Sequence, residues 1–196
     1  MSIQVFQDKI FPRQVSDLMN VMYMMVFKGT DGEEKWDTFL DMKQKEFVAL
    51  CLAQYYQCQH CIEHHTRALL HLEKHDEKFI HKNVRSIVLF LRIDTRMVSG
   101  EEKAQWIDSW KIFSKQFSQA MDDQMLPHLV GLGIGIARND EFLIEFCGGE
   151  VCRLLEDQGI DSRAAIGELE AVVIFMKAAA SKNRVVDKVG ALFQTA

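Results

Sequence analysis

The sequence has few residues that interrupt helices and no long apolar run. Only two of its 196 residues are proline. No segment keeps the alternation of apolar and polar side chains that a half-buried strand requires. The Met-rich segment Val15–Val26 is interrupted by polar residues, is too short to span a bilayer, and is followed by no small-residue cleavage site. These absences disfavour a β fold, a membrane span and a secretory signal, so we expect a cytoplasmic protein.

Positive charge is also scarce. Lys and Arg together number 23 against 28 Asp and Glu, which gives a formal net charge of −5, and no run of Lys or Arg stands out. Nucleic acids and anionic membranes bind to basic surfaces that neutralise phosphates. We therefore expect neither a nucleic acid nor a membrane as partner.

The chain has five cysteines, an odd number that disfavours a complete disulfide framework. In a reducing compartment, a close cysteine pair is more often catalytic or metal-binding than structural. Cys58 and Cys61 form the one such pair. Cys51, Cys147 and Cys152 lie in apolar helical segments, and we interpret them as core residues.

Apolar residues recur at helical spacing along most of the chain, as Ile80, Val84 and Ile87 illustrate. We predict an all-α fold, a compact bundle of about seven or eight helices. We expect residues 1–196 to form a single domain, in which the helices of residues 120–196 have no assigned role.

Polar residues mark several predicted helix ends. Ser99 and Glu102 have the spacing of a capping box. Asn139 or Asp140 can cap a helix that ends near Gly159, and Asp161 can cap the next helix.

The residues with the clearest chemistry lie between positions 46 and 65. Cys58, Cys61 and His65 are related as i, i+3 and i+7, which places them on one helical face. A helix N-terminus stabilises a thiolate, and His65, one turn after Cys61, can accept the thiol proton. Cys58 is close enough to form a disulfide with an oxidised Cys61. The pattern predicts a reactive, partly buried thiol pair.

Glu46 lies in the preceding predicted helix. If the two helices run antiparallel, Glu46 and His65 come within side-chain reach or one bridging water of each other. A carboxylate there would orient the imidazole and raise its basicity.

This arrangement resembles the AhpD-like branch of the carboxymuconolactone decarboxylase family. The resemblance rests on Glu46, on Cys-x-x-Cys beginning twelve residues later, and on His65 four residues beyond Cys61. His60, between the cysteines, also matches, and the likeness covers roughly residues 40–75. Gln57 stands where family members often have Gly.

The resemblance implies an AhpD-like all-α fold, a homo-oligomer, and reduction of hydroperoxides by the cysteine pair without a cofactor or metal. It implies that Cys61 becomes the sulfenic acid and that Cys58 is the proton donor and resolving thiol, with Glu46, His60 and His65 in a proton relay. A dithiol, or a lipoyl or thioredoxin-like protein, would be the reductant. Members of the lactone decarboxylase branch typically lack the cysteine pair, so that activity is not carried over.

Three alternatives remain for the cysteine pair. The thiols could be inert core residues, or they could be a non-enzymatic redox sensor that switches a binding surface. The third alternative is a structural zinc site, with Glu46 and His65 as the further ligands. A site that uses His71 and His75 instead would have to bend a segment that we predict to be continuous helix.

Other motifs have simpler structural interpretations. The spacing of Gly131, Gly133 and Gly135 lacks the strand and lysine of a phosphate-binding loop, so we expect a loop or a close helix contact. The Met cluster near residue 22 indicates adaptable packing or a subunit interface. The following histidines we interpret as solvated or locally hydrogen-bonded: His64, His71, His75, His81 and His128.

Overall fold

A computed structural model describes residues 13–30, 35–72 and 74–194 of the chain. Within these ranges the secondary structure consists of eight α-helices and one short π-helix, and the only strand-like pairing is an isolated bridge between Thr30 and Lys35. The elements are α2 (Arg13–Tyr23), the π-helix η1 (Met24–Lys28), α3 (Met42–Tyr56), α4 (Gln59–Leu72), α5 (Glu77–Leu91), α6 (Gly100–Met121), α7 (Leu126–Arg138), α8 (Glu141–Asp157) and α9 (Ser162–Gln194). The predicted all-α fold is confirmed.

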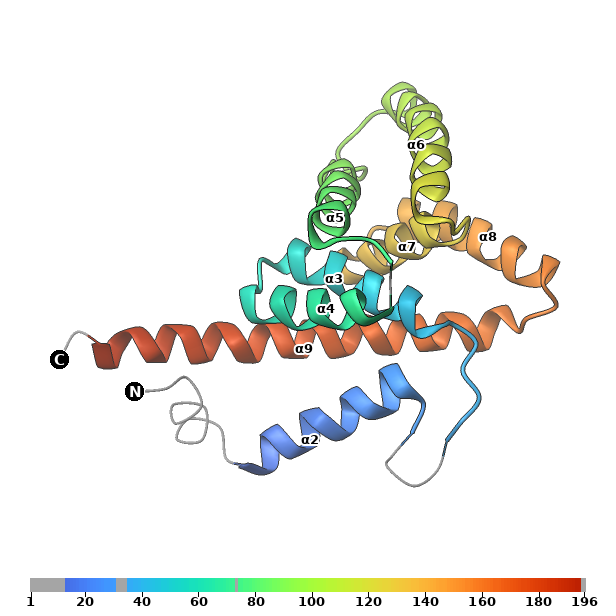
Figure 1. Cartoon of the computed structure of the whole chain (residues 1–196). Coiled ribbons are helices and arrows are strands. Elements are labelled where there is room, and N and C mark those ends of the chain that lie inside the picture. The colour runs from blue at the N-terminus through green and yellow to red at the C-terminus, as the bar shows by residue number, and fades with distance from the viewer. Residues whose placement is uncertain (1–12, 31–34, 73, 195–196) are drawn as a thin grey trace.

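Helix α3 is the centre of the fold. Its residues from Gln44 to Ala53 are all buried, as expected for a helix that is apolar around most of its circumference. It packs against α4, α5, α7 and α9. Figure 1 shows α3 and α4 lying along the long helix α9, with α5 and α6 rising from the opposite side of α3. The segment predicted to be reactive therefore lies between the C-terminal helix and the rest of the bundle.

The predicted helix ends are confirmed. Ser99 and Glu102 form a reciprocal capping box at the start of α6. The Asp140 side chain accepts the backbone N–H of Leu143 at the start of α8, and Gly159 has a positive φ just after that helix. The Asp161 carboxylate accepts two backbone N–H groups in the first turn of α9.

The glycine motif lies within α7, not in a loop. A Cβ atom at Gly131 would lie 2.5 Å from the sulfur of Cys147, and one at Gly135 would lie 3.0 Å from the Cβ of Leu143. The glycines thus allow α7 and α8 to approach closely, which is the helix-contact alternative of the prediction.

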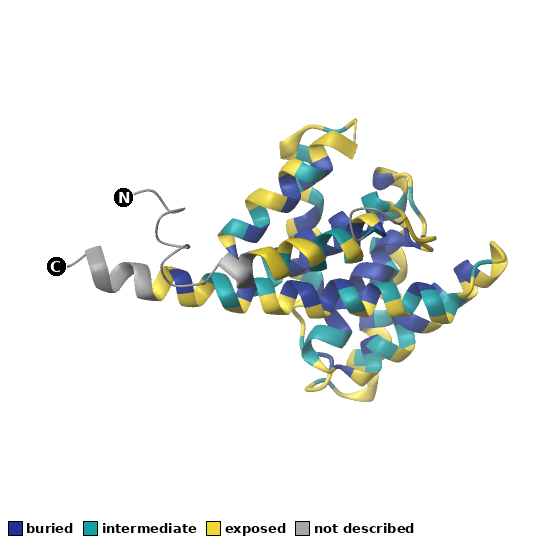
Figure 2. Cartoon of the chain, turned by 90° about the horizontal axis from the view of Figure 1, so that it is seen from below, coloured by how far each residue is buried: buried dark blue, intermediate teal, exposed yellow. Residues whose placement is uncertain are grey.

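The N-terminal helix α2 is only partly buried. Phe27, in η1, lies in the core, and Met19 and Met22 pack against it, whereas Leu18 and Val21 are exposed. In Figure 2 the buried residues lie mainly where the helices meet, and exposed residues cover the outer turns. A subunit interface on this helix, and with it the homo-oligomer, stays a prediction.

Candidate redox site between helices α3, α4 and α9

The two cysteines lie at the turn that joins α3 to α4. Gln57 ends α3 in the left-handed conformation, with φ of 57°. Glycine adopts this conformation without steric cost, which explains why a related turn would favour Gly at this position. Cys58 directly precedes α4 as its N-cap: its carbonyl accepts the N–H of Ile62, and its sulfur accepts the backbone N–H of Cys61 at 3.3 Å. The turn therefore places both sulfurs at the positive end of a helix.

Cys58 and Cys61 form a disulfide, with their Cα atoms 5.3 Å apart. Both residues are buried, with exposed fractions of 3% for Cys58 and 5% for Cys61. The proximity predicted from their spacing is confirmed. Cys58 is no more exposed than Cys61, although it lies nearer the start of α4, because its sulfur faces the first turn of α4 and the side of α9.

Glu46 and His65 form a hydrogen-bonded pair across the α3–α4 hairpin. The Nδ1 atom of His65 lies 2.6 Å from Oε2 of Glu46, and both side chains are almost fully buried. With Nδ1–H donating to the carboxylate, a neutral His65 carries its free lone pair on Nε2. No residue in the described part of the chain forms a hydrogen bond to Nε2. This geometry matches that of a base oriented by a carboxylate, one turn after Cys61.

Tyr23, the last residue of α2, also contacts Glu46. Its hydroxyl donates a hydrogen bond to Oε1 of Glu46 at 2.7 Å. Burial, followed by the charge of Glu46 and its hydrogen bond, raises the pKa of Tyr23 well above its usual value. Tyr23 therefore stays protonated and acts as a donor. Sequence reasoning missed it, because Tyr23 is 23 residues from Glu46 and no spacing links two separate helices.

Asn183, from α9, contacts both sulfurs. Its side-chain nitrogen lies 3.4 Å from Sγ of Cys58 and 3.5 Å from Sγ of Cys61. This residue was also missed, because it lies more than 120 residues away in a helix to which the sequence assigned no role. A half-buried Asn in a long helix carries no signal of its own.

His60 is placed differently from the other site residues. Its Nε2 atom lies 3.0 Å from Oδ1 of Asp187 in α9, and both side chains are partly exposed to solvent. His60 thus pairs with the C-terminal helix and not with either sulfur. The structure joins Cys58 to Cys61 and Glu46 to His65, with His65 one turn after Cys61 on α4, and it pairs His60 with α9 instead.

The remaining cysteines lie elsewhere. Cys51 and Cys147 are buried, and burial raises the pKa of both thiols, to about 12 for Cys147. These two are core residues as predicted. Cys152 is only partly buried, so the prediction that it is a core residue is wrong.

Three of the other histidines pack against neighbouring rings. His64 lies edge-on to the rings of Tyr23 and His65, His75 stacks on Phe79, and His128 packs edge-on against Trp110. Among the described residues, no group of three or more His, Cys, Asp and Glu side chains is arranged to hold a metal ion.

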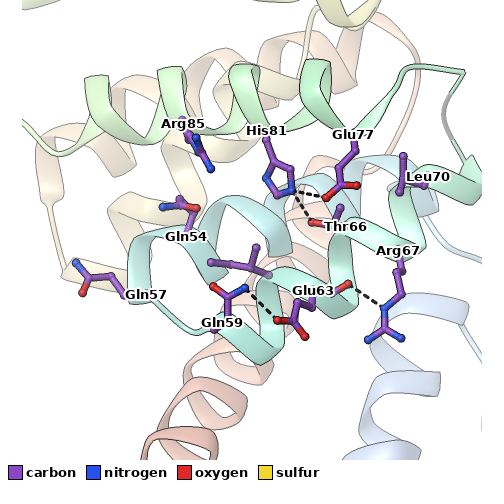
Figure 3. A pocket seen from close by; sticks show the side chains of 11 residues that line it. Gln54, Gln57, Gln59, Glu63, Thr66, Arg67, Leu70, Glu77, His81 and Arg85 are labelled. Atoms are coloured by element: carbon purple, nitrogen blue, oxygen red, sulfur yellow. Dashed lines mark hydrogen bonds and ion pairs between the residues drawn. The ribbon is translucent and has the colours of Figure 1, made fainter.

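A groove of about 590 Å³ lies on another face of α4, between the end of α3 and helix α5 (Figure 3). Its polar side chains largely contact one another: His81 lies near Thr66 and Glu77, and Gln59 donates to Glu63. Neither cysteine lines this groove. The redox site and the groove are therefore separate features of the same helix.

Comparison with known proteins supports the resemblance at this segment. Residues 23–81 match the model of the carboxymuconolactone decarboxylase family. The matched segment starts at Tyr23 and includes both cysteines, Glu46 and His65. No curated protein and no solved structure matches the chain. None of the helices in the described part of the chain combines the length and apolarity needed to span a bilayer.

Proposed function

Because residues 23–81 belong to the carboxymuconolactone decarboxylase family, whose AhpD-like branch includes peroxidases, we propose that the protein is a thiol-dependent hydroperoxide reductase. The proposed reactive pair is Cys58 and Cys61, with His65 as the base and Glu46 as the group that orients it. The substrate class is a hydroperoxide, and the reductant is a dithiol or a lipoyl or thioredoxin-like protein.

The observation that carries this proposal is the 2.6 Å contact between His65 and Glu46, placed one turn beyond a disulfide-forming pair. Both side chains are buried, so they would destabilise the folded protein if they were not hydrogen-bonded to each other. A redox sensor needs a reactive thiol but has no need of an oriented base. An oriented base is what a catalyst needs to move protons during turnover.

The first proposed step is attack of the Cys61 sulfur on the terminal oxygen of the hydroperoxide. The thiol proton passes to Nε2 of His65, the O–O bond breaks, and the alkoxide leaves as an alcohol after taking that proton. The products are a Cys61 sulfenic acid and one alcohol, so the sulfur is oxidised by two electrons and the peroxide is reduced by two. Glu46 stabilises the imidazolium that forms in between.

The second step closes the disulfide. The Cys58 sulfur attacks the sulfenic sulfur of Cys61, the S–O bond breaks, and the hydroxyl leaves as water with the Cys58 proton. The disulfide present in the structure corresponds to the product of this step. An external dithiol then reduces the pair by thiol–disulfide exchange and becomes oxidised itself, which completes the cycle.

Assigning Cys61 as the attacking thiol weighs two effects. The N-cap position and the Cys61 N–H favour a Cys58 thiolate, and a helix terminus contributes ~0.3–1 kcal/mol. His65 lies one turn from Cys61 and two turns from Cys58, and a neighbouring base removes the proton as well as stabilising charge. We therefore keep Cys61 as the peroxide-attacking thiol.

Steady-state consumption of an organic hydroperoxide, with dithiothreitol as reductant, tests the proposal. We expect saturable, catalytic formation of the alcohol, and its loss in the Cys58→Ser, Cys61→Ser double variant. If the reduced protein consumes one equivalent of peroxide and then fails to turn over with any dithiol, the redox-sensor alternative takes its place. Metal analysis of protein purified without added zinc separates the zinc alternative.

A further inference from the structure

Helix α9 supplies a hydrogen-bond donor that both cysteines share. The side-chain nitrogen of Asn183 lies nearly equally far from the two sulfurs, at 3.4 Å from Cys58 and 3.5 Å from Cys61. An amide nitrogen carries two N–H groups and accepts no hydrogen bond, so only a donating contact fits this geometry. Among the described residues, two groups donate a hydrogen bond to these sulfurs: the backbone N–H of Cys61 and the side-chain amide of Asn183.

Two neighbours of Asn183 hold this part of α9 against the turn. Arg184 donates a hydrogen bond to the carbonyl of Tyr56 at 2.9 Å, and Asp187 pairs with His60 at 3.0 Å. Tyr56 comes two residues before Cys58, and His60 lies between the two cysteines. The amide is therefore positioned by contacts that do not depend on the state of the sulfurs.

A donor in this position acts differently on the oxidised and the reduced pair. A disulfide sulfur is a weak acceptor, whereas a thiolate or sulfenate carries a full negative charge and accepts a much stronger hydrogen bond. Hydrogen bonding to the charged form of a group favours that form. The same contact thus contributes little to the disulfide and much to the anions that arise when it is opened.

We propose that Asn183 is a functional group of the redox site, a shared amide donor that stabilises the sulfur anions of Cys58 and Cys61 and so shifts the pair toward its reduced, reactive form. The inference deepens the proposed function, since it rests on the pair undergoing redox turnover. It also assigns a role to the C-terminal helix. Either cysteine can receive the bond, so the donor can follow the negative charge from the attacking sulfur to the resolving sulfur.

The test compares Asn183→Leu, which removes the donor at nearly constant size, with Asn183→Asp, which puts a negative charge in its place. The ultraviolet absorbance of the thiolate is followed against pH in each fully reduced protein. We expect the lowest thiol pKa to rise by about one unit in Asn183→Leu, as for loss of a hydrogen bond to a charged group. It should rise further in Asn183→Asp, because a like charge disfavours the thiolate.

A second readout is the equilibrium between the cysteine pair and dithiothreitol. In this exchange the protein disulfide is reduced to two thiols while the dithiol becomes its cyclic disulfide. Loss of the donor should shift the equilibrium about tenfold toward the protein disulfide, in line with the expected change in thiol pKa. Lys177→Ala, on an exposed turn of the same helix, is the matched control and should change neither readout.

A purely structural role for Asn183 would lower the thermal stability of both variants without changing the order of the thiol pKa values. Unchanged thiol pKa values in a folded Asn183→Leu protein overturn the inference. The same holds if Asn183→Asp, which preserves the size and polarity of the side chain, titrates like the wild type. Because neither readout uses a peroxide, absence of peroxide turnover in the wild type would refute the proposed function and leave this inference standing.

Discussion

The hydroxyl of Tyr23 donates a hydrogen bond to Oε1 of Glu46, while the other oxygen of the same carboxylate binds His65. Two donors, from α2 and α4, thus hold a carboxylate that belongs to the buried helix α3. Each oxygen has one partner, so neither donor replaces the other. The N-terminal helix is thereby coupled to the geometry of the redox site.

Replacing Tyr23 by Phe should therefore affect both stability and activity. The loss of one hydrogen bond to a charged, buried group is expected to cost about 1–2 kcal/mol in the free energy of unfolding. Peroxide turnover should fall as well, because Glu46 loses the hydrogen bond that fixes its orientation toward His65. Urea unfolding and peroxide kinetics measure the two effects, and Tyr55→Phe, which removes a hydroxyl that is not bonded to Glu46, is the control.

The raised pKa of Tyr23 also predicts how stability depends on pH. Burial, and then Glu46, raise its pKa in the folded state, so above the usual value of 10.0 the folded chain retains a proton that the unfolded chain has lost. Stability that Tyr23 contributes is complete below this pH and is lost as the pH rises above it. The stability difference between wild type and Tyr23→Phe should shrink between neutral pH and strongly alkaline pH. A constant difference would contradict the assignment.

Replacing Glu46 by Gln should slow peroxide reduction without unfolding the protein. The neutral amide keeps one acceptor oxygen but no longer stabilises the imidazolium of His65. We expect a loss of ~10²-fold in turnover, comparable to other general acid–base contributions. Glu145→Gln, at an exposed position of α8, is the control. Unchanged turnover would reduce Glu46 to a structural partner of Tyr23 and His65.

The two cysteines should differ in single variants. Cys58→Ser should still consume one equivalent of peroxide and accumulate a sulfenic acid that dimedone traps, whereas Cys61→Ser should lose the fast reaction. Both are best made in a Cys152→Ser background, because Cys152 is an unpaired and only partly buried thiol. The assignment is reversed if dimedone labels Cys58 in the Cys61→Ser protein at the native rate.

A stability prediction concerns the junction of α5, α7 and α8. The Asp140 carboxylate caps α8, accepts the hydroxyl of Thr95, and pairs with Arg138 at 2.6 Å, and the side chains of both charged residues are largely buried. Asp140→Ala leaves Arg138 without its counter-charge, which should cost about 3–5 kcal/mol in the free energy of unfolding. Asp94→Ala removes an exposed partner of Arg96 and should change stability little.

Acid should act through the same carboxylate. Burial by itself would raise the pKa of Asp140. The hydrogen bonds from Thr95 and Leu143 and the pairing with Arg138 outweigh burial, so the pKa is lowered. A depressed pKa contributes stability that is present above the usual value near 3.8 and is lost as the pH falls below it. Urea unfolding between pH 3 and 6 should therefore show a smaller acid loss for Asp140→Ala than for the wild type. Equal slopes would contradict this.

Sequence patterns predicted the elements whose cause is local. The capping box of Ser99 and Glu102 and the cap at Asp161 join residues within four positions of each other, so their spacing alone indicates the contact. The relation of Cys58, Cys61 and His65 follows from helix periodicity in the same way. Glu46 required one further assumption, an antiparallel turn, and its contact with His65 agrees with that assumption.

The sequence by itself thus determined the helices, the cysteine pair and the place of His65 one turn beyond it, because residues a few positions apart on a helix lie close together wherever that helix lies. Only the tertiary structure decided which other groups complete the site. Tyr23 reaches Glu46 from α2, Asn183 reaches both sulfurs from α9, and His60 turns toward Asp187. These contacts join helices far apart in the chain, and they depend on how each helix is rotated as its apolar face packs against α3 and α4. That rotation results from packing over the whole core, and it cannot be predicted from the spacing of a few residues in the sequence.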